Sequence, residues 1–253
     1  MPEELRAHLD RYTAPYELVR EAGDRRLLLV VDHATNAIPA EMGTLGLSEA
    51  SLGRHIASDL GVAALARELA AAMNAPAILA GFSRLVIDAN RGEDDPTLVM
   101  RLSDGDVIPG NVAADEAEIA RRVRLYHRPY HTAIDAALDR ALAGDVRPLL
   151  ISLHSFTPVW RGRPRPWHCA ILSSGDRTTA DGLLSRLRAN RALLVGDNEP
   201  YSGDLEGDCM DRHGTRRGLP HALIELRQDL ILTHDQRGEW VRRLSAILAE
   251  MVG

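Results

Sequence analysis

The stretch LLLVVDHATN, residues 27–36, decides the fold prediction for this chain. Its first five residues are all apolar, which is typical of a strand that is buried on both faces of a parallel sheet. His33 follows two residues after this run. In α/β proteins, ligands bind in the crevice beyond the carboxyl ends of such strands. The stretch therefore predicts an α/β protein with a polar site where the strand ends.

The same alternation of short apolar runs with longer alanine- and leucine-rich segments continues along the chain. It predicts a three-layer α/β fold, with a mostly parallel central sheet and helices on both faces. No repeat and no flexible linker divides the sequence, so residues 1–253 are expected to form a single domain. Strands are expected at residues 27–31, 77–79, 85–88, 149–153, 169–172, 192–196 and 222–226, and helices at 51–73, 114–124, 129–142, 180–189 and 237–251.

Composition excludes several classes of function. The net charge is −6, with 36 acidic and 30 basic residues, which speaks against nucleic acid as a partner. Every basic residue is an arginine, so lysine chemistry is excluded. Neither dinucleotide-binding nor P-loop glycine motifs occur. The remaining class is an enzyme or binding protein for a small molecule.

The expected location is the cytoplasm. The chain has two cysteines, Cys169 and Cys209, too few for a disulfide framework, so both are expected to be reduced thiols. The N-terminal stretch MPEELRAHLDRY lacks the apolar core of a secretory signal. The longest apolar run is too short to span a bilayer, so no membrane association is expected. The sequence does not indicate an oligomeric state.

Two histidines at the ends of predicted strands indicate a metal site. His154 follows the run PLLISL as His33 follows LLLVV. A catalytic zinc site generally has three protein ligands and a water molecule. Asp59 is the preferred third ligand, because it lies on the predicted helix 51–73 one turn from His55. His55 itself is expected to contact a metal ligand rather than the metal. Asn36 is the alternative, but a neutral amide is a poor zinc ligand, so Asn36 is expected to orient substrate.

Further histidines are expected to be structural. His127 and His131 are four residues apart, but Pro129 lies between them and is expected to break the helical geometry that would align the pair. Cys209 and His213 have the same spacing in a glycine-rich segment, where no regular structure is expected to hold a metal.

Glu225 and three arginines complete the candidate residues. Glu225 lies in the strand-like run HALIELRQDL, where apolar surroundings should raise the pKa of a carboxyl group towards that of a general base. The alternative is an ion pair between Glu225 and Arg227. Arg84 and Arg91 flank the predicted strand 85–88, and an arginine can hold a carboxylate through two hydrogen bonds. Asp88 is a possible internal partner for one of them.

The motifs VDHATN, RHIASDLG, SRLVIDANR, LHSF, NEPYSG and IELRQDL, in this order, resemble the N-formylglutamate amidohydrolase family over nearly the whole chain. The resemblance implies a fold like that of zinc carboxypeptidases and muramoyl amidases. It implies one Zn²⁺ held by His33, Asp59 and His154, with Glu225 as the catalytic glutamate. One departure is Ser58, where the family often carries an aromatic residue before the acid.

The activity implied by this resemblance is hydrolysis of the formyl amide of N-formyl-L-glutamate to formate and L-glutamate, in histidine degradation. The substrate is then a small anion. Arg84, Arg91 and Arg227 are the candidate clamps for its carboxylates, and Asn198 and Tyr201 in NEPYSG are candidate hydrogen-bond donors to it. The alternatives are a hydrolase of another N-acyl amino acid or small amide, and a catalytically silent binding protein on the same fold.

Overall fold

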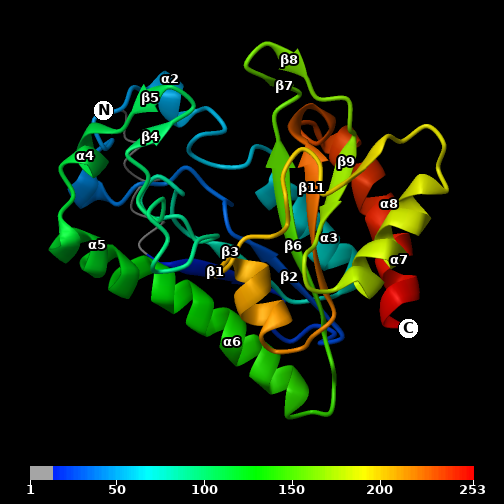
Figure 1. The fold of residues 1–253 in the computed structure, drawn as a ribbon. Coiled ribbons are helices and arrows are strands. Elements are labelled where there is room, and N and C mark those ends of the chain that lie inside the picture. The colour runs from blue at the N-terminus through cyan, green and yellow to red at the C-terminus, as the bar shows by residue number, and fades with distance from the viewer. Residues whose placement is uncertain (1–13) are drawn as a thin grey trace.

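The computed structural model describes residues 14–253 (Figure 1). The N-terminal stretch MPEELRAHLDRY, and with it the prediction about a secretory signal, lies outside this range. Seven strands form the central sheet. Across the sheet they are β1 (Tyr16–Val19), β3 (Ala77–Ala80), β2 (Leu27–Val31), β6 (Leu149–Phe156), β11 (His221–Arg227), β9 (Cys169–Leu172) and β10 (Val195–Asp197).

The sheet is mostly parallel, as the sequence predicts. β2 pairs in parallel with both β3 and β6, β6 pairs in parallel with β11, and β9 with β10. The pairs β1–β3 and β9–β11 are antiparallel. The edge strand β1 is not in the sequence prediction.

Helices cover both faces of the sheet. One face packs against α3 (Val62–Met73), α7 (Arg177–Arg188) and α8 (His234–Val252), whereas α6 (Arg128–Leu142) packs against the other (Figure 1). Alternate residues of β2 supply the two cores: Leu27 and Leu29 belong to the first, and Leu28 and Val30 to the second. The predicted three-layer α/β architecture is confirmed.

The shorter elements are η1 (Ala40–Met42), α2 (Glu49–Leu52), β4 (Leu102–Ser103), β5 (Asp106–Val107), α4 (Pro109–Val112), α5 (Glu116–Arg122), η2 (Val123–His127), β7 (Val159–Trp160), β8 (Arg163–Pro164), η3 (Asp211–Thr215) and η4 (Gln228–Leu230). The elements η2 and η3 are π-helical turns. Among the helices of residues 14–253, none is long and apolar enough to cross a membrane.

The predicted helix 51–73 is interrupted, so that prediction was wrong in its first half. α2 ends at Leu52, and α3 begins only at Val62. Gly61, which precedes α3, has φ +82°, a left-handed conformation that breaks a continuous helix. Asp59 therefore lies in a turn rather than on a helix face, and its backbone N–H donates to the carbonyl of His33 at 3.0 Å.

The predicted strand 85–88 is a buried turn, although its apolar residues are fully enclosed. The side chain of Asn111 donates to the carbonyl of Leu85 at 2.8 Å, and Arg122 donates to the carbonyl of Val86 at 2.9 Å. Because side chains satisfy these carbonyl groups, the segment needs no neighbouring strand. A short apolar run does not by itself distinguish the two structures.

Other boundaries differ by a few residues. The strand expected at 192–196 is β10, which begins three residues later than predicted. β6 extends to Phe156, so His154 lies within this strand rather than after it. The helices expected at 114–124 and 129–142 join through η2 into one helical path.

Candidate active site and metal centre

The parallel pairing of β2, β6 and β11 brings the candidate residues to the same end of the sheet. His154 and Glu225 are neighbours in the register of β6 and β11. β2 pairs with β6 on its other side, so the end of β2 delivers His33 to the same place. Parallel pairing of these strands, with His33 in the turn directly after β2, therefore explains why residues almost two hundred positions apart in sequence meet.

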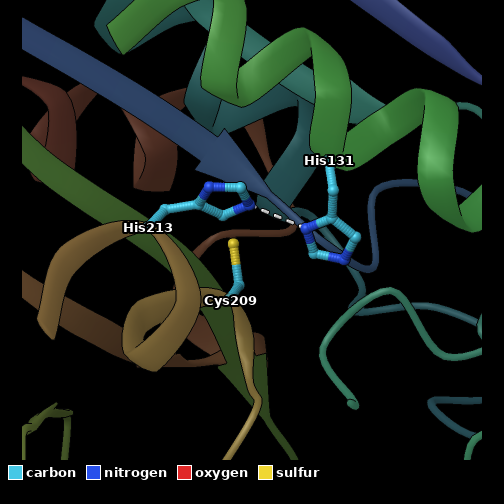
Figure 2. Close-up of side chains that lie close together, drawn as sticks. All are labelled: His131, Cys209 and His213. Carbon is cyan, nitrogen blue, oxygen red and sulfur yellow. Dashed lines mark hydrogen bonds between the residues drawn. The ribbon is translucent and has the colours of Figure 1, made fainter. Parts of the chain in front are cut away.

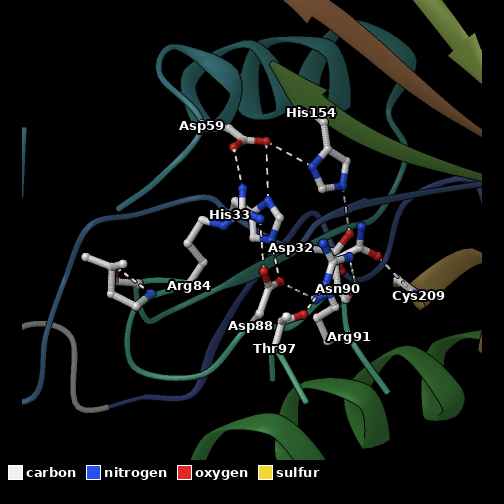
Figure 3. A network of polar contacts seen from close by, with 12 residues as sticks. Asp32, His33, Asp59, Arg84, Asp88, Asn90, Arg91, Thr97, His154 and Cys209 are labelled. Atoms are coloured by element: carbon white, nitrogen blue, oxygen red, sulfur yellow. Dashed lines mark hydrogen bonds and ion pairs between the residues drawn. The ribbon is translucent and has the colours of Figure 1, made fainter. Parts of the chain in front are cut away.

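Two histidines and one aspartate form a buried cluster (Figure 3). The Asp59 Oδ2 atom lies 2.9 Å from His154 Nδ1 and 3.5 Å from His33 Nδ1. The two imidazole rings are 4.8 Å apart and nearly perpendicular. Each of the three residues is less than 9% exposed. The structure thus brings together the three residues that the sequence analysis names as metal ligands.

A second buried carboxylate supports each imidazole from the opposite side. His33 Nε2 lies 2.7 Å from Asp88 Oδ1, and His154 Nε2 lies 3.0 Å from Asp32 Oδ2. Asp32 also accepts hydrogen bonds from Tyr130 and Ser152. A histidine whose far nitrogen donates to a carboxylate presents its near nitrogen, here Nδ1, towards a metal ion.

The cluster fits a divalent cation. Within residues 14–253, His33 Nδ1 is a buried nitrogen without a hydrogen-bond partner, and it faces Asp59. Burial would lower the pKa of His154, but hydrogen bonds with Asp32 and Asp59 raise it well above its usual value. Burial would likewise raise the pKa of Asp59, yet His33 and His154 lower it. These carboxylates therefore favour positive charge at the centre, and two nitrogens with one oxygen are a suitable donor set for zinc.

Glu225 lies beside this cluster as a buried carboxyl group. In the described part of the chain its Oε2 atom has no hydrogen-bond partner. Burial, with a further contribution from the charge of Asp59, raises the pKa of Glu225 to about 7. The alternative of an ion pair with Arg227 is not what the structure shows, because Arg227 binds Asp229 at 2.8 Å. A carboxyl group with this pKa suits a general acid–base.

A cavity of about 500 Å³ opens over the cluster. His33, Asp59, His154 and Glu225 lie in its wall, and its remaining polar wall includes Arg84, Arg91, His55, Tyr201 and Trp160. This volume is suitable for a small-molecule ligand.

The arginines of the cavity differ in how far they are already paired. Arg84 donates to Asp88 at 2.9 Å and lies 3.6 Å from Asp59, so its charge supports the cluster itself. Arg91 contacts Thr97 and the carbonyl of Asn90 through its Nε and Nη1 atoms. Arg91 Nε also lies 3.8 Å from Asp95 Oδ2, a longer ion pair than either of those that Arg84 makes.

Three predicted substrate-binding residues lie elsewhere within the described residues, outside the cavity wall. Asn36 is exposed and donates to the carbonyl of Leu52 at 2.9 Å, so it takes no part in the metal cluster. Asn198 has φ +53°, and its amide binds the backbone of Ser173 and Gly203. Arg227 is paired with Asp229.

Sequence reasoning missed Asp32, which holds His154, and assigned Asp88 only to an arginine. The available signal is position: Asp32 directly precedes His33, and Asp88 ends a fully buried apolar run. A fully buried carboxylate needs a partner, so an aspartate at the end of a buried run is itself a site signal.

Helical turns carry three further histidines, His127, His131 and His213. Pro129 lies in the first turn of α6, where a proline is tolerated, so the helical path is not broken. The rings of His127 and His131 lie 4.3 Å apart, with their Nε2 atoms at 3.2 Å. His213 lies in the π-helical turn η3, which corrects the expectation of an irregular segment.

Comparison with known proteins gives the family of the chain and solved structures that share its fold. The sequence profile of the N-formylglutamate amidohydrolase family matches residues 25–232. The solved structure of gene product Atu2144 from Agrobacterium tumefaciens is 32% identical, with a TM-score of 0.91 over 95% of this chain and 96% of that chain. The structure of N-formylglutamate amidohydrolase from Ralstonia eutropha JMP134 is 21% identical, with a TM-score of 0.75 over 94% and 97%. No curated protein matches this chain in sequence.

The fold and the family match together define an amide hydrolase of the α/β class. The chain belongs to the N-formylglutamate amidohydrolase family.

Proposed function

We propose that this protein is a zinc-dependent hydrolase that cleaves the formyl amide of N-formyl-L-glutamate, giving formate and L-glutamate. The observation that carries the proposal is the buried His33–Asp59–His154 cluster with the partnerless carboxyl oxygen of Glu225 beside it, in a chain of this family. A binding protein needs no general base, so the place of Glu225 beside both histidines favours catalysis.

The residues of the site suggest a division of roles. When bound by His33, Asp59 and His154, zinc lowers the pKa of a water molecule and polarises a carbonyl oxygen. Glu225 removes a proton from the attacking water and returns it to the amide nitrogen, which leaves as the free amine. Asp32 and Asp88 hold the two imidazoles in the orientation that presents Nδ1.

Substrate binding is assigned to the cavity wall. Arg91 binds a substrate carboxylate, and Tyr201, in the same cavity wall, donates a hydrogen bond to the substrate. Arg84 neutralises Asp59 and Asp88 and contributes its positive charge to the same region. The ligand is thus a small anion.

The metabolic setting that we propose is histidine degradation in the cytoplasm, carried out by one amidohydrolase domain. Among the described residues, Cys169 and Cys209 are both free thiols, which accords with a reducing compartment.

The test is formate release from a panel of N-formyl amino acids by the metal-loaded protein. We expect N-formylglutamate to be the best substrate, and we expect a chelator to abolish turnover and added zinc to restore it. His154→Ala should abolish turnover, whereas His234→Ala, at a largely exposed side chain, should leave it unchanged. Full turnover in the chelated protein or in His154→Ala would contradict the proposed mechanism. If another N-acyl amino acid is hydrolysed faster, the proposed mechanism still holds, but the proposed substrate is wrong.

A further inference from the structure

A second cluster of metal-binding side chains lies outside the cavity wall described above. His131, Cys209 and His213 are each less than 2% exposed, and one donor atom from each lies within 4.8 Å of the others. His131 comes from α6, His213 from η3, and Cys209 from the segment just before η3 (Figure 2). The sulfur of Cys209 and the facing nitrogens of both imidazoles point towards a common centre in this view.

Both π-helical turns of the described chain adjoin this cluster. The turn η2 leads directly into α6, which carries His131, and η3 contains His213. A π-helical turn is rare and occurs frequently at functional sites. Its additional residue rotates the side chains that follow it, which provides a physical reason for these two turns at this place.

A carboxylate supports one imidazole of the cluster from outside, whereas the outer nitrogen of His131 lies 3.2 Å from His127 Nε2. His213 Nδ1 lies 3.0 Å from Asp135 Oδ1, and Arg217 also binds this carboxylate at 2.9 Å. With the proton on Nδ1, His213 presents its Nε2 lone pair to the centre. His131 presents Nδ1, which lies 2.8 Å from His213 Nε2.

We propose that His131 Nδ1, Cys209 Sγ and His213 Nε2 form a second, structural site for a thiolate-binding divalent cation such as zinc. Two imidazole nitrogens and one sulfur are typical zinc ligands. In tetrahedral zinc sites, where zinc–nitrogen distances are about 2.0–2.1 Å, two nitrogens lie about 3.4 Å apart. The rings therefore need to separate by roughly half an ångström from their present 2.8 Å contact.

The position of the cluster suggests its role. Tyr130, next to His131 in α6, donates to Asp32, and Asp32 holds the catalytic His154. Met210 and Asp211, next to Cys209, lie in the cavity wall. A metal ion at this site fixes α6 and the η3 segment to each other behind the catalytic histidine.

The alternative is a chain of hydrogen-bonded neutral imidazoles without metal. His127, His131, His213 and Asp135 are linked in series, with successive contacts of 3.2, 2.8 and 3.0 Å. Such a chain engages both histidines of the cluster, while the Cys209 thiol donates its hydrogen bond to Asp32. Coordination of a metal ion by the Cys209 sulfur therefore distinguishes the two arrangements.

Cobalt substitution of the full-length protein provides the test. Only a thiolate ligand gives cobalt(II) an intense near-ultraviolet charge-transfer absorption, and the catalytic cluster contains no sulfur. We expect this absorption in the cobalt-loaded protein, together with two bound metal ions per chain. Cys209→Ser should remove the absorption and one metal ion. Cys169→Ser is the matched control, because Cys169 is equally buried in β9, and it should change neither.

The outcomes separate this proposal from the proposed function. His154→Ala should lose turnover but keep the thiolate absorption. If Cys209→Ser does not fold, retention of the absorption in Cys169→Ser still assigns it to Cys209, because the chain has two cysteines. The proposal is overturned if the folded, fully cobalt-loaded protein lacks thiolate absorption, or if Cys209→Ser keeps it.

Discussion

Glu225 combines deep burial with an unpaired carboxyl oxygen and a pKa raised to about 7. Glu225→Gln preserves the shape of this side chain and removes its basicity. We expect the variant to fold and to bind metal normally, while kcat falls by roughly two to four orders of magnitude, the usual contribution of a positioned acid–base group. Metal content and kcat should be measured together.

Glu239→Gln, at an exposed side chain, is the control for this variant and should keep wild-type kcat. Near-normal turnover in Glu225→Gln would show that Glu225 is structural.

The sequence predicts some residues of the candidate site and misses others. His33 and Glu225 are predictable because their places at or within fully apolar runs are visible in the sequence. Asp59 lies beside both histidines, as the sequence analysis expected, but a turn and not a helix face carries it. Asp32 was missed because its role depends on a contact with His154, which is 122 residues away and unrelated to local spacing.

Asp32 and Asp88 allow a second prediction at the scale of the residue. Asn at either position keeps the size of the side chain but loses the negative charge that holds an imidazole. We expect Asp32→Asn and Asp88→Asn to weaken metal binding by roughly ten- to a hundredfold, the usual effect of removing such a support. Competition with a chelator measures the affinity. Asp181→Asn on the surface of α7 should leave it unchanged, and equal affinities in all three variants would refute the assignment.

Among the elements, the turn between α2 and α3 matters most for the site, because it carries Asp59. A Cβ atom at Gly61 would lie 2.7 Å from the carbonyl oxygen of Ile231, and φ there is +82°. Gly61→Ala should therefore destabilise the protein by more than the roughly 1–2 kcal/mol that a left-handed conformation alone costs. Thermal unfolding is the measurement.

Gly105→Ala is the control that separates the cost of a positive φ from the cost of the close contact with Ile231. Gly105 also has a positive φ, but nothing lies within 4 Å of its added Cβ. Gly105→Ala should show the conformational cost alone, and a Tm at least as low as that of Gly61→Ala would be inconsistent with the close contact.

The same comparison of elements explains which parts of the fold the sequence predicts. The fully apolar run of β2 forms the buried parallel strand that it predicts. The segment 85–88 has the same apolar character, yet the side chains of Asn111 and Arg122 take its carbonyl groups. Such long-range hydrogen bonds leave no trace in local periodicity, so the sequence could not distinguish this turn from a strand.

The whole molecule is negatively charged, and so is the proposed substrate. The chain carries −6, which opposes the approach of a dianion unless positive charge is concentrated at the cavity. Several acidic side chains of the cavity wall are already neutralised: Asp104 binds Arg54, and Asp211 binds Arg216 at 2.7 Å. Arg84 is committed to Asp59 and Asp88. We therefore propose that Arg91, whose ion pair with Asp95 is longer than those of Arg84, recognises a second substrate carboxylate.

Arg91→Lys keeps the charge but removes the planar pair of donors. We expect kcat/KM for N-formylglutamate to fall by roughly ten- to a hundredfold, the effect of losing a hydrogen bond to a charged group. N-formylglutamine is nearly isosteric but has one carboxylate fewer, so the wild-type enzyme should use it poorly, and the variant should lose less with it. Arg186→Lys, on the surface of α7, should leave kcat/KM for both substrates unchanged. Equal kcat/KM for both substrates in the wild-type enzyme would contradict a dianionic substrate and favour a broader N-acyl amino acid hydrolase.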